Sequence, residues 1–301
     1  MSETNSLFTA LDDSAEYLSW REQKISSYPK TVDELIVPVK DPVRLDEQEH
    51  AAIGDLLRRA NMAVWVAEPD PSNDKIVSLN MGMQYGMQRL DHNMGADHDG
   101  VSELTVREGQ WRAGYIPYTN RPIHWHTDGY YNTEEHQICG LVLYCVEPAA
   151  KGGENALLDH EIAYIHLRDT NPDYIHALLH PQAMTIPANI VNGREIRPDR
   201  TGPVFSVLEN GALHMRYTAR ARNVIWRDDP LTHEAVACLN EFMASDSPYI
   251  FRARLAPGQG LICNNVLHDR SGFDNDEKHE RLLYRLRYYD RAVINDSWES
   301  R

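Results

Sequence analysis

The chain has 301 residues, 42% of them hydrophobic, and a formal net charge of −15 at pH 7. This length allows one large domain with a sizeable core, because β-rich folds often use it as a single unit. The negative charge argues against nucleic acid or an anionic membrane surface as the main partner. It does not identify a substrate.

Four cysteines, Cys139, Cys145, Cys238 and Cys263, are scattered without the spacing of a metal or redox motif. Most of them lie in apolar runs, so we expect buried thiols rather than disulfides or zinc ligands. The first residues are polar with no apolar leader, and no stretch is long enough to span a bilayer. We therefore expect a cytoplasmic protein.

In the N-terminal part, the first forty-odd residues are charged and predict irregular structure. A helix is predicted from Asp46, which with Glu49 resembles a capping box before an apolar stripe. Residues 62–67 predict a short buried strand. The methionine- and glycine-containing stretch 80–100 predicts either a lid at the substrate cavity or core packing, since methionine fills gaps in cores.

From Pro117 the pattern becomes mainly β. The dipeptide Asn210-Gly211 predicts a hairpin between two short strands. Helices are predicted at Asn171-Pro172 and Asp229-Pro230, because each pair places a capping residue before proline at the first helical position. Apolar or alternating runs predict further strands at residues 138–146, 249–255, 261–265 and 282–289.

This series of short strands, turns and inserted helices predicts a mainly β fold with flanking helices, built as a barrel-like sandwich. No repeat or linker divides the sequence, so we expect one domain over residues 1–301. Residues 1–115 would supply helical and β elements, with a lid if residues 80–100 form one. Residues 116–301 would form a metal-binding core.

The triplet His126-Thr127-Asp128 and a distant His268 are the most informative motif. Alternate side chains of a strand share one face, so His126 and Asp128 would point the same way. Two imidazoles and one carboxylate can bind one face of an iron ion and leave the other open for substrate and oxygen. His124 shares that face but does not complete the triplet, so we expect it to support the site or to pack.

Four motifs in a fixed order resemble the TauD/TfdA family of taurine-dioxygenase-like Fe(II)/2-oxoglutarate enzymes, and less closely the γ-butyrobetaine hydroxylases. They are residues 123–130, Gly152-Gly153-Glu154-Asn155, residues 265–268, and Arg281 with Arg285. The resemblance runs from about Ile116 to the C-terminus. It implies a double-stranded β-helix core of the jelly-roll or cupin-like kind. It also implies Fe(II), 2-oxoglutarate and O₂ as the reagents, with His126, Asp128 and His268 as iron ligands.

The resemblance assigns Arg281 to the far carboxylate of 2-oxoglutarate, a group that arginine matches in bidentate geometry. Arg281 opens a strand that we expect to neighbour the strand of His268. Arg285 would bind either an anionic substrate group or 2-oxoglutarate. Asn155 stands where the family has threonine, and its amide can still donate a hydrogen bond to the co-substrate.

Candidate substrate residues are Tyr130, Tyr131 and Arg220. The tyrosines directly follow the metal motif, where aromatic side chains either shape a pocket or pack. Arg220 and Arg222 alternate onto one face, and Arg216 would join them on an unbroken strand. Near the site these arginines would favour a carboxylate, sulfonate or phosphonate; on the surface they would pair with acidic residues.

The resemblance thus predicts an Fe(II)- and 2-oxoglutarate-dependent dioxygenase. It would oxidise, by hydroxylation, a small and preferably anionic metabolite and release succinate and CO₂. Asp128 disfavours halogenation, because halogenases of this superfamily lack the carboxylate. Two alternatives are a cupin-like sensor that binds metal and 2-oxoglutarate without turnover, and a metallohydrolase using the same triad. The sequence leaves a homo-oligomer open.

Overall fold

The computed structural model describes residues 7–11, 14–69, 72, 75–92, 99–107, 115–220, 222 and 224–294. The chain divides into two compact units. Unit 1 comprises the chain up to Tyr28, His124–Gln137 and Leu158–Ile250. Unit 2 comprises Pro29–Ile123, Ile138–Leu157 and the chain from Phe251 onward. The single domain expected over residues 1–301 stays a prediction.

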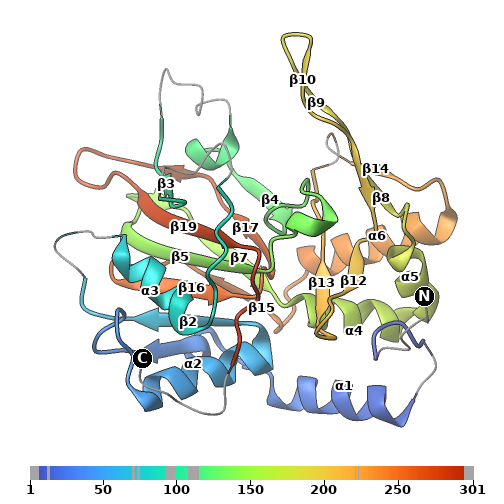
Figure 1. Cartoon of the computed structure of the whole chain (residues 1–301), viewed down its shortest axis with the longest axis horizontal. Helices are drawn as coiled ribbons and strands as arrows, with labels where there is room; N and C mark the ends of the chain where they lie inside the picture. The colour runs from blue at the N-terminus through green and yellow to red at the C-terminus, as the bar shows by residue number, and fades with distance from the viewer. Residues whose placement is uncertain are drawn as a thin grey trace. The chain divides into compact units, whose positions relative to one another are not determined.

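Unit 2 is built on a six-stranded sheet (Figure 1). Its central strands β16, β5 and β19 are antiparallel neighbours, and the edge strand β1 is parallel to β2. Strand β5 is largely apolar because both of its faces are buried, as Leu141 and Val142 are, whereas β19 also carries the buried Arg285 and Arg287. The order is β1 (Ile36–Pro38), β2 (Met62–Val66), β16 (Gln259–Cys263), β5 (Gly140–Glu147), β19 (Leu282–Tyr288) and β3 (Ser102–Leu104).

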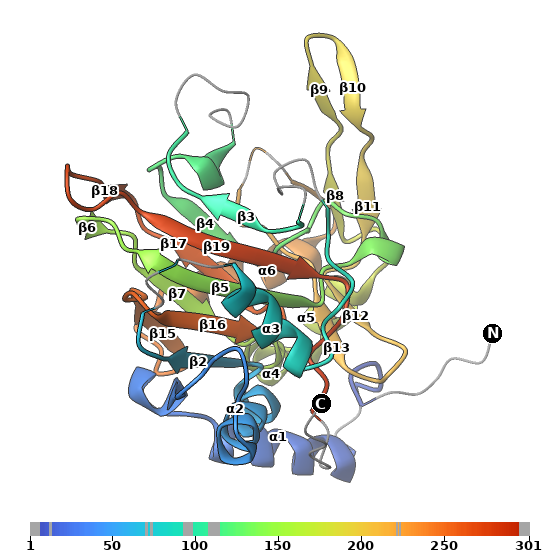
Figure 2. The ribbon, with the colours of Figure 1, turned by 60° about the vertical axis from the view of Figure 1, so that its left-hand side comes forward.

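Two helices pack on this sheet. Helix α2 (Glu47–Ala60) begins at the predicted capping box of Asp46 and Glu49 and lies against β1 and β2. Helix α3 (Ile76–Gln84) lies across β5, β16 and β19 (Figures 1 and 2). Short 3₁₀ turns occur at Val32–Leu35 and Ile116–Tyr118.

The stretch predicted as a lid or as core packing supplies side chains to the core, and the lid alternative stays a prediction. Met81 and Met87 are fully buried, which is core packing, whereas Met83 is exposed. Residues 93–98 of this stretch, which include His98, lie outside the described residues.

Unit 2 also contains strands β6 (Lys151–Gly152) and β18 (Phe273–Asp274), which pair antiparallel. A four-stranded sheet has the order β15 (Ile250–Ala253), β7 (Asn155–Leu158), β17 (Leu267–Arg270) and β4 (Ile123–His126). The divisions between the two units fall within β4, β7 and β15.

One expectation about strand order is wrong. The strand that follows Arg281 is β19, which pairs with β5 and β3, whereas His268 lies on β17 in the four-stranded sheet. The apolar residues of β19 fit the twice-buried sheet centre. Asn265, with φ of 50°, interrupts the chain between β16 and β17, so these two strands join different sheets.

Unit 1 is helical with small sheets. Helices α4 (His160–Thr170), α5 (Pro172–Leu179) and α6 (Pro230–Ala244) pack on one another, and a 3₁₀ turn spans Glu134–His136. The predicted starts of α5 and α6 are confirmed, because Asn171 and Asp229 cap them and proline follows. The strands are β8 (Met184–Ile186), β9 (Asn189–Val191), β10 (Arg194–Arg197), β11 (Arg200–Gly202), β12 (Phe205–Val207), β13 (Leu213–Met215) and β14 (Ile225–Trp226).

The hairpin predicted from Asn210-Gly211 is confirmed. Strands β12 and β13 pair antiparallel, and Gly211 has φ of 82° in the turn between them. A positive φ at this point is the conformation that glycine adopts without a steric penalty. A second hairpin, β9 with β10, extends away from β8 and β14 (Figure 1).

The irregular N-terminus predicted from the sequence is wrong, because residues Ala15–Ser27 form helix α1. Its anchors are charged: Lys24 Nζ lies 2.6 Å from carboxylate oxygens of both Asp159 and Glu161. The guanidinium of Arg168 lies 3.4 Å from the ring centroid of Tyr17. A helix anchored by charged side chains does not need a stripe of apolar residues. Hydrophobic periodicity therefore did not reveal it.

No helix within the described residues has the length and apolar character needed to cross a membrane. None of the four cysteines forms a disulfide with a described residue.

Candidate metal and co-substrate site

His126 and Asp128 approach each other within unit 1. Strand β4 ends at His126, so Asp128 lies just beyond the strand rather than on it. Thr127 fixes the turn: its N–H donates to the carbonyl of Tyr217, and its hydroxyl accepts from the N–H of Tyr217, both at 3.0 Å. His126 Nε2 then lies 3.7 Å from Asp128 Oδ1, and both residues are buried. The two side chains do point the same way, as the motif predicted.

Both histidines of the motif are oriented by backbone carbonyls two residues earlier. His126 Nδ1 lies 2.9 Å from the oxygen of His124, and His268 Nδ1 lies 2.9 Å from the oxygen of Val266. A carbonyl only accepts, so each Nδ1 carries the proton and each Nε2 keeps its lone pair. This is the arrangement in which a histidine is ready to bind a metal. His124 contributes its carbonyl, while its ring is exposed.

Three buried side chains of the predicted triad come together. His126, Asp128 and His268 each offer one ligand atom, and these atoms lie within 4.8 Å of one another. Among the described residues, no fourth histidine, cysteine or carboxylate joins this group. Two neutral imidazoles and one carboxylate are a donor set that suits Fe(II) and leaves positions for other ligands.

Arg281 lies in unit 2, directly before β19, and is 4% exposed. Within the described part of the chain its Nη1 has no hydrogen-bond partner, and its guanidinium forms no ion pair within 4 Å. Burial lowers its pKa to about 10, so it stays protonated at neutral pH. A buried charge without a counter-charge is destabilising. The carboxylate of a bound co-substrate would remove that cost, so the residue fits the predicted role.

Arg270 is a site residue that the sequence reasoning missed. It lies on β17 two residues after His268, is buried, and donates to the carbonyl oxygens of Thr119, at 2.8 Å, and of Arg121. It therefore holds the segment before β4 against β17. The available signal was its spacing, since residues two apart on a strand share a face.

Arg270 also belongs to a group of three guanidiniums with Arg281 and Arg285. Its pKa is lowered to about 9, first by burial and then by the charges of Arg281 and Arg285. All three arginines are buried. Their proximity creates a positive potential that favours a dianion such as 2-oxoglutarate.

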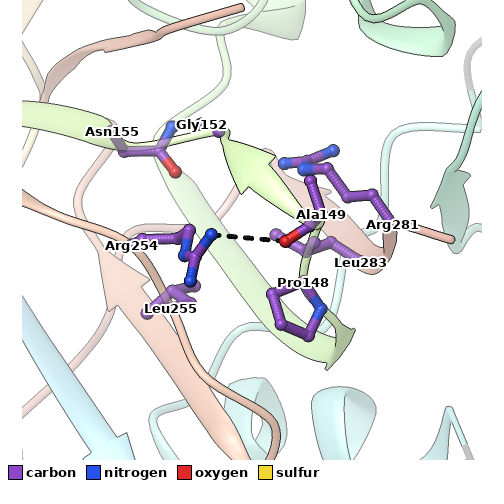
Figure 3. Close-up of a pocket in the computed structure, with 9 residues that line it drawn as sticks. Pro148, Ala149, Gly152, Asn155, Arg254, Leu255, Arg281 and Leu283 are labelled. Atoms are coloured by element: carbon purple, nitrogen blue, oxygen red, sulfur yellow. Dashed lines mark hydrogen bonds between the residues drawn. The ribbon is translucent and has the colours of Figure 1, made fainter. Parts of the chain in front are cut away.

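Asn155 and Arg281 line one pocket of unit 2, together with Arg254, which the sequence analysis did not single out (Figure 3). The amide of Asn155 donates to the carbonyl oxygen of Asp269 at 2.6 Å, and Arg254 donates to that of Ala149 at 3.2 Å. Asn155 thus contacts the backbone beside His268 as well as the pocket. The pocket's remaining lining residues are Pro148, Ala149, Gly152, Gly153, Leu255 and Leu283.

The paired glycines before Asn155 form the tight turn expected of them. Gly152 has φ of 69°, and a Cβ there would collide with the carbonyl oxygen of Gly272. Gly153 donates to that same oxygen at 3.1 Å. This close approach holds β6 beside β18 at the edge of the pocket, and only glycine permits it.

The candidate substrate residues have different environments. The ring of Tyr130 meets that of His126 edge-on, with centroids 6.4 Å apart, and Tyr131 meets Tyr130 in the same way at 5.2 Å. Arg220 is half-buried and Arg222 exposed. Arg216 does not share their face: it is buried and donates to the carbonyl of Met184 at 2.5 Å.

The fold of this chain resembles that of known iron oxygenases. The structure of an asparagine oxygenase in complex with Fe(II), 2S,3S-3-hydroxyasparagine and succinate superposes with a TM-score of 0.56, at 15% identity, over 97% of this chain and 94% of that one. This likeness shows the fold, and the His-Asp-His group on it is a donor set of the iron-binding class.

Sequence comparison identifies the family within this class. Residues 25–287 match the family described as taurine catabolism dioxygenase TauD, TfdA. The chain belongs to this TauD/TfdA family. It is 35% identical over 250 residues to a uridine-5′-phosphate dioxygenase of an Amycolatopsis species, covering 78% of this chain and 87% of that one. A uridine-5′-phosphate dioxygenase of a Streptomyces species is 31% identical over 177 residues, covering 56% and 62%.

The predicted activity class is confirmed by this membership. The protein is an Fe(II)- and 2-oxoglutarate-dependent dioxygenase that uses O₂ to oxidise a small molecule. The sensor and metallohydrolase alternatives do not account for two dioxygenase relatives.

Proposed function

We propose that the protein oxidises a nucleoside 5′-monophosphate, with uridine 5′-phosphate as the first candidate. The observation that carries this proposal is the 35% identity to the Amycolatopsis uridine-5′-phosphate dioxygenase over 87% of that protein's length. A phosphate monoester is also a small anion, the substrate type expected from the sequence. Its charge suits a chain that has arginines beside its aromatic candidate residues, such as Arg197 at 5.9 Å from the ring of Tyr131.

We assign the iron ligands to His126, Asp128 and His268. Their burial, the 4.8 Å limit on the separation of their ligand atoms and the two carbonyl-oriented imidazoles support the assignment. When bound, Fe(II) would supply the oxidising chemistry, in which 2-oxoglutarate and O₂ give succinate and CO₂. The protein supplies the orientation of the rings and a buried setting.

We assign the 2-oxoglutarate carboxylate to Arg281, with Arg285 and Asn155 at the same site. The buried Nη1 of Arg281 supports the first assignment, and the shared effect of Arg281 and Arg285 on Arg270 supports the second. Asn155 lines the pocket of Arg281 and contacts the backbone of Asp269. Tyr130, Tyr131 and Arg220 remain the proposed substrate residues, and the edge-on contact of Tyr130 with His126 supports the tyrosines.

We also propose that the core is a double-stranded β-helix within one domain. The antiparallel sheets and the likeness to the asparagine oxygenase support this finer description. We infer a cytoplasmic location, supported by the absence of disulfides among the described cysteines. The net charge of −15 supports a small molecule rather than nucleic acid or a membrane as partner, and a homo-oligomer is left to measurement.

Succinate formation tests the proposed function. Protein supplied with Fe(II), 2-oxoglutarate, air and uridine 5′-phosphate should form one succinate for each nucleotide consumed. His126→Ala should form none. Cytidine 5′-phosphate, uridine and taurine should be run in parallel to show whether base, phosphate or both are recognised. Succinate formed at the same rate with and without the nucleotide would contradict the proposed substrate.

A further inference from the structure

Two arginines of unit 1 have no role in the assignments above. Arg197 ends β10 and Arg200 begins β11, at the base of the β9–β10 hairpin (Figure 2). Both are half-buried, whereas Arg194 on the same hairpin is exposed. Half-burial of two adjacent cations disfavours them unless they meet an anion.

Arg197 is held in one orientation. Its Nη1 and Nη2 donate to the carbonyl oxygens of Pro198 and Pro187, each at 2.7 Å. Its guanidinium carbon lies 5.9 Å from the ring centroid of Tyr131. Two carbonyl contacts use two of the five N–H donors, so the others remain for a ligand. A guanidinium fixed in this way loses little freedom on binding.

Arg200 has donors to spare. Its Nη1 lies 3.4 Å from the carbonyl oxygen of Asp199, and its buried Nε has no hydrogen-bond partner in the described part of the chain. Neither Arg197 nor Arg200 forms an ion pair within 4 Å of a described carboxylate. The charge of Arg200 acts on the exposed carboxylate of Glu135. The pKa of Glu135 is lowered chiefly by backbone and hydroxyl hydrogen bonds and less by Arg200.

These arginines connect to the metal motif through aromatic contacts. Tyr131 meets Tyr130 at 5.2 Å, and Tyr130 meets His126 at 6.4 Å. The pKa of Arg197 is lowered by burial and then by Arg200, while Tyr130, Tyr131 and the exposed Asp199 act in the opposite direction. All these residues belong to unit 1.

We propose that Arg197 and Arg200 form an anion subsite that binds the phosphate group of the substrate, with Tyr131 as a positioning residue for Arg197. This inference rests on the proposed function, because it takes the substrate to be a nucleotide. A phosphate monoester presents several acceptor oxygens and close to two negative charges, which match two guanidiniums. The subsite uses arginines other than Arg281 and Arg285, which are assigned to 2-oxoglutarate.

The test compares uridine 5′-phosphate with uridine as substrates. In the wild type the phosphate should raise kcat/KM, mainly through a lower KM. Arg197→Gln and Arg200→Gln should each reduce the kcat/KM ratio of nucleotide over nucleoside by about 10- to 100-fold, the effect of losing a charged hydrogen bond. Arg194→Gln, which removes the same charge from an exposed position of the hairpin, should leave that ratio as in the wild type.

Arg200→Gln and one further variant, Arg197→Lys, separate binding from folding. Arg200→Gln removes one weak carbonyl contact only, so it keeps the test valid where loss of Arg197 unfolds the hairpin. Arg197→Lys keeps the charge but loses the planar fork, so it should recover part of the ratio. A nucleotide-over-nucleoside ratio unchanged in both glutamine variants would overturn the subsite while leaving the proposed function intact.

A wild type that does not oxidise uridine 5′-phosphate would refute the proposed function, and the subsite would then be judged by anion binding. Inorganic phosphate would be titrated by calorimetry into protein loaded with Fe(II) and 2-oxoglutarate under argon. Binding shared by the wild type and Arg194→Gln, and lost in Arg197→Gln and Arg200→Gln, would uphold an anion subsite for another substrate. Equal binding in all four proteins, or binding in none, would overturn it.

Discussion

The side-chain amide of Asn155 donates a 2.6 Å hydrogen bond to the carbonyl oxygen of Asp269, the residue that follows His268. The N–H of Ala156 donates to the Asp269 carboxylate at 2.8 Å, so β7 holds the neighbour of His268 at two points. Asn155 therefore supports the position of His268 as well as lining the pocket of Arg281.

Replacement of Asn155 should weaken metal binding. Asn155→Ala removes the support for His268, and loss of such an outer contact costs roughly 10-fold or more in metal affinity. Asn155→Asp should have a similar effect, because a carboxylate cannot donate to a carbonyl. Fe(II) titration under argon measures both. Wild-type Fe(II) affinity in the two variants would show that the contact does not position His268.

Arg281 should govern the requirement for 2-oxoglutarate. Arg281→Ala should raise the KM for 2-oxoglutarate by about 100-fold, because it leaves a buried carboxylate without its partner. Arg281→Lys should recover part of this loss through its charge alone. Arg252→Ala, at an exposed position, is the matched control. If Arg281→Ala keeps the wild-type KM, the carboxylate binds elsewhere, with Arg254 of the same pocket as the next candidate.

The buried ionisable cluster of Lys24, Asp159 and Glu161, which anchors α1, should make the stability of the protein depend on pH. Asp159 is fully buried, and burial raises its pKa to about 6, with Lys24 acting against this and Glu161 adding to it. A carboxyl whose pKa is higher in the folded than in the unfolded state contributes stability below about pH 4. That contribution is lost as the pH rises through about 6.

Asp159→Asn isolates this effect, because an amide stays neutral and asparagine still caps a helix. The free energy of unfolding of the variant, relative to the wild type, should increase from pH 4 to pH 7. Denaturant titrations at several pH values measure the difference. A relative stability that stays constant, or that falls over this range, would show that Asp159 does not have a raised pKa.

Local signals predicted the elements that depend on local geometry. Asn210-Gly211 specifies a hairpin because its glycine takes a positive φ, and Asn171-Pro172 starts a helix because cap and proline suit its first turn. Helix α1 escaped detection because its anchor Lys24 is a charged residue whose partners lie far along the chain. The order of the strands was not predicted either, because an apolar run does not specify which strand it pairs with.

The site likewise combines features that the sequence marks with contacts that it does not reveal. The sequence marks His126 and Asp128 as a pair, but their approach depends on the turn at Thr127, which the distant Tyr217 holds and the sequence does not reveal. The role of Arg270 is not revealed either, because its carbonyl partners at Thr119 and Arg121 carry no side-chain signature. The bond from Asn155 to Asp269 is equally invisible in the sequence, where only the match to a family motif marked Asn155.

The three proposed ligands can be tested by one spectroscopic measurement. Fe(II) chelated by 2-oxoglutarate has a visible charge-transfer absorption band, which is recorded under argon to prevent turnover. The wild type should show this band, and uridine 5′-phosphate should shift it. Asp128→Ala and His268→Ala, folded by circular dichroism, should lack it at the same concentrations. A wild-type protein without the band, or a band of full intensity in either variant, would contradict the assignment of His126, Asp128 and His268 as the iron site.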